Sequence, residues 1–345
     1  MTQMTPKEYK EWIRRAHDEK FALAAVNVSD SNTAIAAVKA FEELNSPGII
    51  QITSGSAKHN SINEDLVEGS FNLAEFLQSL IMEAEVPLAL HTDHCHAELL
   101  EEWLKPLVEL QAEVVEANLE AANEEGLSEL PEDFYKYSPA YTWNSNMFDG
   151  SHIDLDANIE KSVQMANLCA AAHSMLECEL GTWGGSEDGV SDDSSYTSVE
   201  DVVKMDSALA EIGLKSEDYL LAVAFGNAHG MAKKANLKPE ILRDINEATG
   251  KEFNFVFHGT SGSDPAVIRQ AIEYGVVKVN LDSQFQFAYS GGMASVIADN
   301  VDLVRDSAKG KKFYDPRVGS KAARVAMTES VKEYIEILGS ANKAD

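Results

Sequence analysis

The chain has 345 residues, 44% of them hydrophobic, so it is long enough to bury a large core and is neither a disordered protein nor a small disulfide scaffold. Its formal net charge of −29 argues against nucleic acid and membrane surfaces as partners, because both are themselves anionic. Three cysteines, an amino-terminus without an apolar segment, and no run near the ~18 apolar residues of a membrane span predict a cytoplasmic protein with free thiols.

Eight short apolar segments recur along the chain with helical stretches between them, a pattern typical of buried parallel strands joined by crossover helices. The segments are 21–28, 48–53, 86–93, 142–149, 174–181, 219–227, 253–261 and 276–282. The stretches 32–45 and 158–174 carry apolar residues at the three- and four-residue spacing of such helices. Eight strand–helix units predict an α/β fold of the closed (β/α)8 TIM-barrel type. No linker or repeat divides the sequence, so we expect a single domain over residues 1–345.

Two regions are predicted to be additions to the barrel. Residues 116–140, between strands 3 and 4, hold seven acidic residues against the single Lys136, which indicates a solvated and partly helical insertion. The tail after residue 283 has two stretches of helical character separated by residues 310–317, which predicts a C-terminal helical extension.

Three histidines follow three of the predicted strands, at the barrel end where strand-to-helix loops converge and barrel enzymes place their chemistry. They are His94, His229 and His258, and three ligands at three strand ends match a catalytic zinc site with one open position. The other nearby side chains are interpreted as structural or surface residues: His59, His91, His96 and His173, with Cys95 as a packed thiol.

Glu177 and Glu179 share one face of the fifth strand, because side chains alternate along a strand. Glu179 is nearer the loop and within reach of a metal, whereas Glu177 is expected to form a buried ion pair. The glycine-rich acidic stretch 181–193 is predicted to move as a lid and to bring Glu187 or Asp188 into the site as a general base.

The segments HGTSGS (258–263) and NLDS (280–283) are similar to the phosphate site that many barrels form after strands seven and eight. An acidic protein that binds an anion needs local positive potential, and Lys233 and Arg317 are the candidates for supplying it.

The ordered motifs HTDHC, ELGTWGGSEDGV, FGNAHG, FVFHGTSGS, YGVVKVNLDS and YDPR together resemble the class II fructose-1,6-bisphosphate aldolases, from about residue 20 to 320. The resemblance implies the same barrel and a reversible aldol cleavage of fructose 1,6-bisphosphate in glycolysis and gluconeogenesis. Zn²⁺ would act there as a Lewis acid on the enediolate left by carbon–carbon cleavage, so no catalytic lysine is needed.

The resemblance also implies roles for individual residues. His94, His229 and His258 would bind the zinc ion, with Glu179 and Asp149 able to hold it in an alternative position. Glu187 would move the proton at C3 of dihydroxyacetone phosphate, and Asp93 would act at the C4 oxygen.

The substrate-binding residues implied by the resemblance fall into groups. The dihydroxyacetone phosphate end would contact Lys233, Ser261, Asp282 and Ser283, with Asn280 near the reacting carbons. Carbonyls around Gly230 and Gly259 would hold a monovalent cation, Na⁺ or K⁺. The aldehyde end would contact Asn27, Thr53 and Arg317. The arginine would reach in from a neighbouring subunit, which implies a homodimer or homotetramer.

Three alternatives remain open at this point. A tagatose-bisphosphate aldolase would use the same chemistry on a different stereoisomer. A TIM-barrel metallohydrolase would usually carry His-x-His at its first strand, which this chain lacks. A non-catalytic binding protein would be expected to lose Asp93, Glu187 or one of the histidines, and all of them are present.

Overall fold

The computed structural model describes residues 3–181, 196–227, 236–260 and 262–344. Eight parallel strands close into a barrel in chain order, each pairing with the next and the last with the first. The strands are β1 Leu23–Asn27, β2 Gly48–Thr53, β3 Leu88–His96, β4 Ser145–Asp149, β5 Met175–Leu180, β6 Leu220–Val223, β7 Asn254–Phe257 and β8 Val276–Leu281. The predicted (β/α)8 barrel is confirmed.

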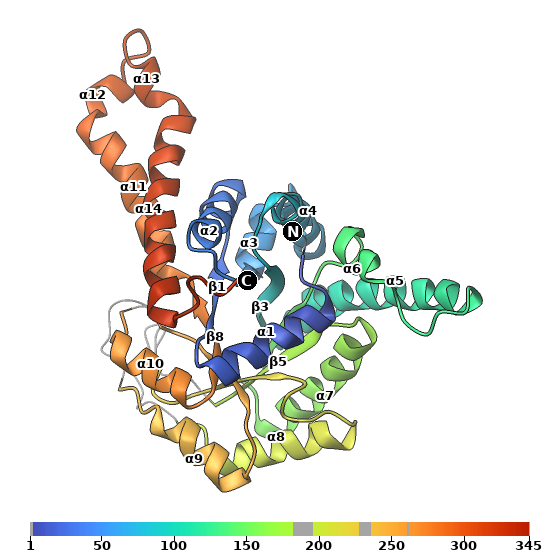
Figure 1. The fold of residues 1–345 in the computed structure, drawn as a ribbon. Helices are drawn as coiled ribbons and strands as arrows, with labels where there is room; N and C mark the ends of the chain where they lie inside the picture. The colour runs from blue at the N-terminus through green and yellow to red at the C-terminus, as the bar shows by residue number, and fades with distance from the viewer. Residues whose placement is uncertain (1–2, 182–195, 228–235, 261, 345) are drawn as a thin grey trace.

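Helices follow each strand and surround the barrel (Figure 1). After β1 to β4 they are α2 Ser31–Glu43, α3 Ser54–His59, α4 Leu66–Glu83, the π-helical turn η1 Leu100–Leu104, α5 Lys105–Glu124, α6 Glu132–Tyr137 and α7 Leu155–Ala171. After β5 to β8 they are α8 Val199–Glu211, α9 Glu240–Thr249, α10 Pro265–Glu273, α11 Ser283–Asp299, α12 Val301–Val304, α13 Lys311–Tyr314 and α14 Pro316–Leu338.

The helix α1 (Pro6–Glu19) closes the amino-terminal mouth of the barrel. It starts at a capping box in which Thr5 and Glu8 satisfy each other's backbone N–H groups. Its buried side chains, Tyr9 and Ile13 among them, pack on inward residues of the strands such as Leu23 and Val277. The interior near this mouth is therefore apolar, and polar groups are left for the middle and the opposite end of the barrel.

Several predicted strand limits were wrong by three or four residues. The sixth and seventh strands end at Val223 and Phe257, four residues before their predicted ends, and the chain continues there into loops. After β6 the sequence stays apolar through Phe225, whereas polar residues begin directly after β7 at His258. The fourth strand starts at Ser145 rather than at residue 142. The third continues to His96, three residues beyond its predicted end.

The two additions to the barrel lie where they were predicted. The insertion between β3 and β4 is partly helical, but residues 116–124 continue α5 outward from the barrel, and the side chains of Phe134 and Tyr135 pack near the buried Tyr141. The C-terminal extension is an arm in which α11 and α14 pack side by side, with α12 and α13 at its tip (Figure 1). Its two long helices are separated by residues 300–315, which contain the short α12 and α13. The predicted separator at 310–317 therefore lies within this stretch except for its last two residues, which begin α14.

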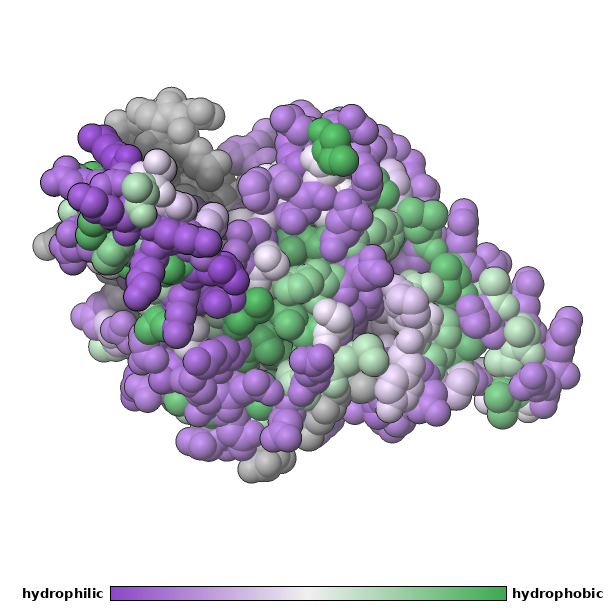
Figure 2. All heavy atoms as spheres, turned by 90° about the horizontal axis from the view of Figure 1, so that it is seen from above, coloured by the Kyte–Doolittle hydropathy of each residue, from purple (hydrophilic) through white to green (hydrophobic). Residues whose placement is uncertain are grey.

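The surface seen in Figure 2 is mostly hydrophilic, in agreement with the many charged residues of the sequence. Hydrophilic side chains cover most of the face drawn in Figure 2, with apolar side chains between them. Within the described residues, none of the helices combines the length and apolar character required to cross a bilayer.

Candidate active site

A bulge near the end of β3 turns two consecutive side chains into the barrel. The ladder with β4 pairs Thr92 with Asn146 and Cys95 with Phe148, which leaves one extra residue on β3. His94 accommodates the bulge with a φ of 44°, in the left-handed region that residues other than glycine rarely adopt. Asp93 and His94 therefore both contact interior groups, although the alternation of an ideal strand would place them on opposite faces.

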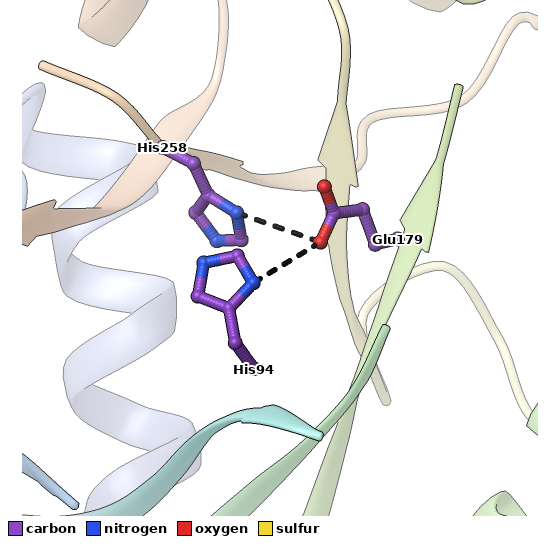
Figure 3. Close-up of side chains that lie close together, drawn as sticks. All are labelled: His94, Glu179 and His258. Carbon is purple, nitrogen blue, oxygen red and sulfur yellow. Dashed lines mark ion pairs between the residues drawn. The ribbon is translucent and has the colours of Figure 1, made fainter. Parts of the chain in front are cut away.

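Side chains from β3, β5 and the end of β7 meet in one cluster, formed by His94, Glu179 and His258 (Figure 3). The Nδ1 atoms of His94 and His258 each lie 3.7 Å from Oε2 of Glu179. Candidate ligand atoms of the three residues all lie within 4.8 Å of one another. Neither oxygen of the buried Glu179 accepts a hydrogen bond from the described residues. Two imidazole nitrogens and a carboxylate without donors suit a borderline divalent metal such as zinc.

A buried ion pair lies beneath this cluster and holds His258 in place. Lys278 Nζ lies 2.8 Å from Glu177 Oε2, and both side chains are fully buried. His258 Nε2 donates to Glu177 Oε1 at 2.9 Å, which leaves Nδ1 directed at Glu179. Metal-binding histidines commonly donate their second nitrogen to such a carboxylate. The prediction that Glu177 forms a buried ion pair is confirmed.

The pKa values of Glu177 and His258 are shifted by their burial and by their charged neighbours. Burial alone would raise the pKa of Glu177, but Lys278 and the His258 hydrogen bond more than offset this and hold the pKa well below its usual value. Burial lowers the pKa of His258, so its imidazole is neutral and suited to bind a metal.

Two other carboxylates of the site, Glu179 and Asp149, have pKa values shifted in opposite directions. Burial and the charge of Asp149 raise the pKa of Glu179 well above its ordinary value. The pKa of Asp149 is far below its ordinary value, because its close contacts with His94 and His96 outweigh the effect of its burial. Asp149 Oδ2 lies 3.1 Å from His94 Nδ1. With Asp93 also close, these carboxylates overcome burial and raise the pKa of His94 to about 10.

Asp93 is held in one orientation by two amides. Asn27 Nδ2 donates to Oδ2 at 2.8 Å and Asn280 Nδ2 donates to Oδ1 at 2.9 Å. Burial alone would raise the pKa of Asp93, but the His94 and Lys278 charges lower it, so this carboxylate is ionised. Asp93 Oδ1 lies 4.0 Å from His94 Nε2, which places this carboxylate beside the cluster. A molecule bound at the cluster can therefore exchange a proton with Asp93.

The other predicted residues within the described part, with the exception of Arg317, lie around the same end of the barrel. Thr53 caps α3 with its hydroxyl, and Asp282 and Ser283 begin α11 directly after β8. Gly259 follows His258 with a φ of 66° that favours glycine. Arg317, at the start of α14, is 89% exposed and pairs with Asp315, so no contact with the cluster is made within this chain.

Six predicted residues lie outside the described residues: Glu187, Asp188, His229, Gly230, Lys233 and Ser261. The predicted lid over 181–193 also lies outside them, apart from Gly181. Sequence reasoning also missed some participants within the described part. Lys278 is the clearest, because a lysine inside the apolar run of β8 is a signal that can be read from the sequence. His152 gave no such signal, because it follows β4 in an ordinary turn.

The barrel and this cluster together define a (β/α)8 enzyme with a candidate site for a divalent metal at the carboxyl ends of its strands. The family described as Fructose-bisphosphate aldolase class-II matches residues 7–343. A fructose-bisphosphate aldolase of Streptomyces galbus is 40% identical over 98% of this chain and 97% of its own length. A fructose-bisphosphate aldolase of Mycobacterium tuberculosis is 36% identical over 99% of this chain and 98% of its own length. The crystal structure of a fructose-bisphosphate aldolase from Campylobacter jejuni superposes with a TM-score of 0.79 at 28% identity, covering 99% of this chain and 97% of that one.

The chain belongs to the class II fructose-bisphosphate aldolase family, whose members are carbon–carbon lyases. The family is generally zinc-dependent, in keeping with the donor atoms of the cluster.

Proposed function

We propose that this protein catalyses the reversible aldol cleavage of fructose 1,6-bisphosphate to dihydroxyacetone phosphate and glyceraldehyde 3-phosphate, with Zn²⁺ as its metal. The observation that carries the proposal is the position of Asp93 beside the cluster of His94, Glu179 and His258, in a chain of this family.

The donor set supports zinc. His94 and His258 supply imidazole nitrogens, and His229 is the proposed third ligand. Glu179 and Asp149 provide carboxylates for an alternative position of the ion. When bound, zinc supplies Lewis acidity beside the substrate carbonyl and stabilises the negative charge that carbon–carbon cleavage leaves there.

The protein's own side chains move the protons. In the cleavage direction Asp93 accepts the proton of the C4 hydroxyl while the C3–C4 bond breaks and its electron pair stays on C3. Its low pKa and its two amide donors support this role, because an ionised and fixed carboxylate is ready to accept a proton. Glu187 then delivers a proton to C3. In the condensation direction both transfers reverse.

Residues around the rim bind the two ends of the sugar bisphosphate. Asn280 contacts the reacting carbons of the substrate. Its hydrogen bond to Asp93, the residue that acts at C4, supports this role. The dihydroxyacetone phosphate end contacts Lys233, Ser261, Asp282 and Ser283, and the carbonyls at Gly230 and Gly259 hold Na⁺ or K⁺. The aldehyde end contacts Asn27, Thr53 and Arg317.

Arg317 acts in a neighbouring subunit of a homodimer or homotetramer. Its exposure supports this arrangement, since the guanidinium group is open to a neighbouring subunit. The α11–α14 arm also exposes large apolar side chains: Phe287 at 64%, Ile297 at 42%, Val301 at 41% and Val325 at 53%. Apolar side chains gathered on a projecting arm favour self-association. Each subunit works as a single domain in the cytoplasm.

The substrate assignment is tested by measuring kcat/KM for fructose 1,6-bisphosphate and tagatose 1,6-bisphosphate in parallel, with product trapped by a coupled dehydrogenase. We expect a clear preference for the fructose compound. A preference for tagatose bisphosphate would retain the aldolase mechanism but contradict the assignment of fructose 1,6-bisphosphate as the substrate. Hydrolysis of a phosphate or amide without carbon–carbon cleavage would favour a barrel metallohydrolase.

A further inference from the structure

A second cluster of metal-binding groups lies beside the first, formed by His96, Asp149 and His152. Their candidate ligand atoms also lie within 4.8 Å of one another. His96 Nδ1 is 3.0 Å from Asp149 Oδ2, and the His96 and His152 rings meet edge to face with centroids 5.4 Å apart. The Nδ1 atom of His96 is buried and makes no hydrogen bond of good geometry with the described residues.

Local structure explains why these three side chains converge. The bulge in β3 brings His96 into register with Asp149 at the ends of the two strands. The chain then turns at Gly150, where a Cβ atom would lie 2.1 Å from Asn158 Oδ1, so a larger residue would have to displace the Asn158 side chain. This turn returns His152 toward the strand ends just before α7 begins.

Asp149 is fixed in the orientation that a ligand needs. Its Oδ1 accepts hydrogen bonds from the backbone N–H and the hydroxyl of Ser151, at 3.1 and 2.6 Å. Its Oδ2 is thereby presented to His96 on one side and to His94 on the other. The carboxylate is 3% exposed and ionised, whereas His96 is 40% exposed and His152 is at the surface, so an ion can reach the cluster from solvent.

We propose that His96, Asp149 and His152 form a second site for a divalent first-row transition metal, distinct from the ion assigned to His94 and His258. Two imidazoles and one carboxylate favour Zn²⁺ or Co²⁺ over Mg²⁺ or Ca²⁺, which prefer oxygen-only ligands. Solvent completes the coordination on the exposed side. An ion there also draws Asp149 Oδ2 away from His94 Nδ1, so occupancy of the second site changes the affinity of the first.

The test is a cobalt titration of the zinc-loaded enzyme, followed by visible absorption of bound Co²⁺ and by elemental analysis after gel filtration. We expect the wild-type enzyme to bind one Co²⁺ per chain in addition to its zinc. His152→Ala changes an exposed side chain, so the fold is retained, and it should weaken the additional cobalt by about tenfold or more. His96→Asn should have the same effect. His17→Gln, on α1 at the opposite mouth of the barrel, is the matched control and should bind cobalt as the wild type does.

Cobalt binding by His152→Ala and His96→Asn equal to that of the wild type would overturn the proposal, as would a wild-type enzyme that takes up no second ion. The result is independent of the proposed function, because it is read from bound metal. An enzyme that binds the second ion but cleaves no sugar bisphosphate would reject the proposed function alone, and one that cleaves the sugar without binding the second ion would reject this site alone.

Discussion

Removing the Lys278 ammonium should destabilise the protein strongly, because it would leave Glu177 as a buried charge without its partner. The two side chains are fully buried and 2.8 Å apart. Breaking one side of a buried pair typically costs about 3–5 kcal/mol in the free energy of unfolding. We therefore expect Lys278→Met to lower that free energy by about 3–5 kcal/mol at pH 7, measured by urea unfolding at a fixed protein concentration.

Two further variants separate the ion pair from general damage to the barrel. Glu177→Gln on the Lys278→Met background removes both charges, so the double variant should recover part of the loss and show a coupling energy of at least about 1 kcal/mol. Lys10→Met breaks the exposed ion pair between Lys10 and Asp218. This pair also joins a lysine to a carboxylate, and its distance of 3.0 Å is similar to that of the buried pair. This variant should cost less than about 1 kcal/mol, because solvent screens that pair.

The pH dependence gives an independent check. Because the folded-state pKa of Glu177 lies below its ordinary value of 4.5, its stabilising contribution is present above about pH 4.5 and is lost as the pH falls. Lys278→Met raises this pKa, so the gap between wild type and variant should narrow in acid. A loss below about 1 kcal/mol in Lys278→Met, or strict additivity in the double variant, would refute the reasoning.

Three further variants test the assigned roles. Glu187→Ala should lower kcat by about 10²- to 10⁴-fold with bound zinc unchanged, and an unaltered kcat would remove Glu187 from the mechanism. His258→Ala should weaken zinc binding at least about a hundredfold in a competition assay with a chelator, whereas retention of the wild-type affinity would place the ion elsewhere. Arg317→Ala should raise KM for the sugar bisphosphate roughly tenfold with little change in kcat, because it loses a charged contact to a phosphate; gel filtration checks that the oligomer persists, and an unchanged KM would contradict the assignment.

The barrel could be predicted from the sequence because its signal is repeated. Eight apolar segments alternate with amphipathic helices, and errors of a few residues at strand ends do not change the topology. The strand ends themselves could not be predicted well, because apolar residues continue past the end of β6 as Ala224 and Phe225, and the polar residues that follow β7 from His258 onward were included in the predicted strand.

The site could be predicted only in part, and for physical reasons. His94, His258 and Glu179 follow from polar residues at the ends of buried strands. The joint inward placement of Asp93 and His94 depends on the bulge in β3, which alternation does not reveal. The pairing of Lys278 with Glu177 depends on contacts across the barrel between residues 101 positions apart in the chain.

The most direct test of the account is fructose 1,6-bisphosphate cleavage by the enzyme as purified, after removal of metal with EDTA, and after addition of stoichiometric Zn²⁺. The account predicts loss of cleavage on chelation and its return with zinc, because a zinc ion held by His94 and His258 would supply the Lewis acidity that stabilises the charge left by carbon–carbon cleavage. Cleavage that persists in the metal-free enzyme would contradict the central claim.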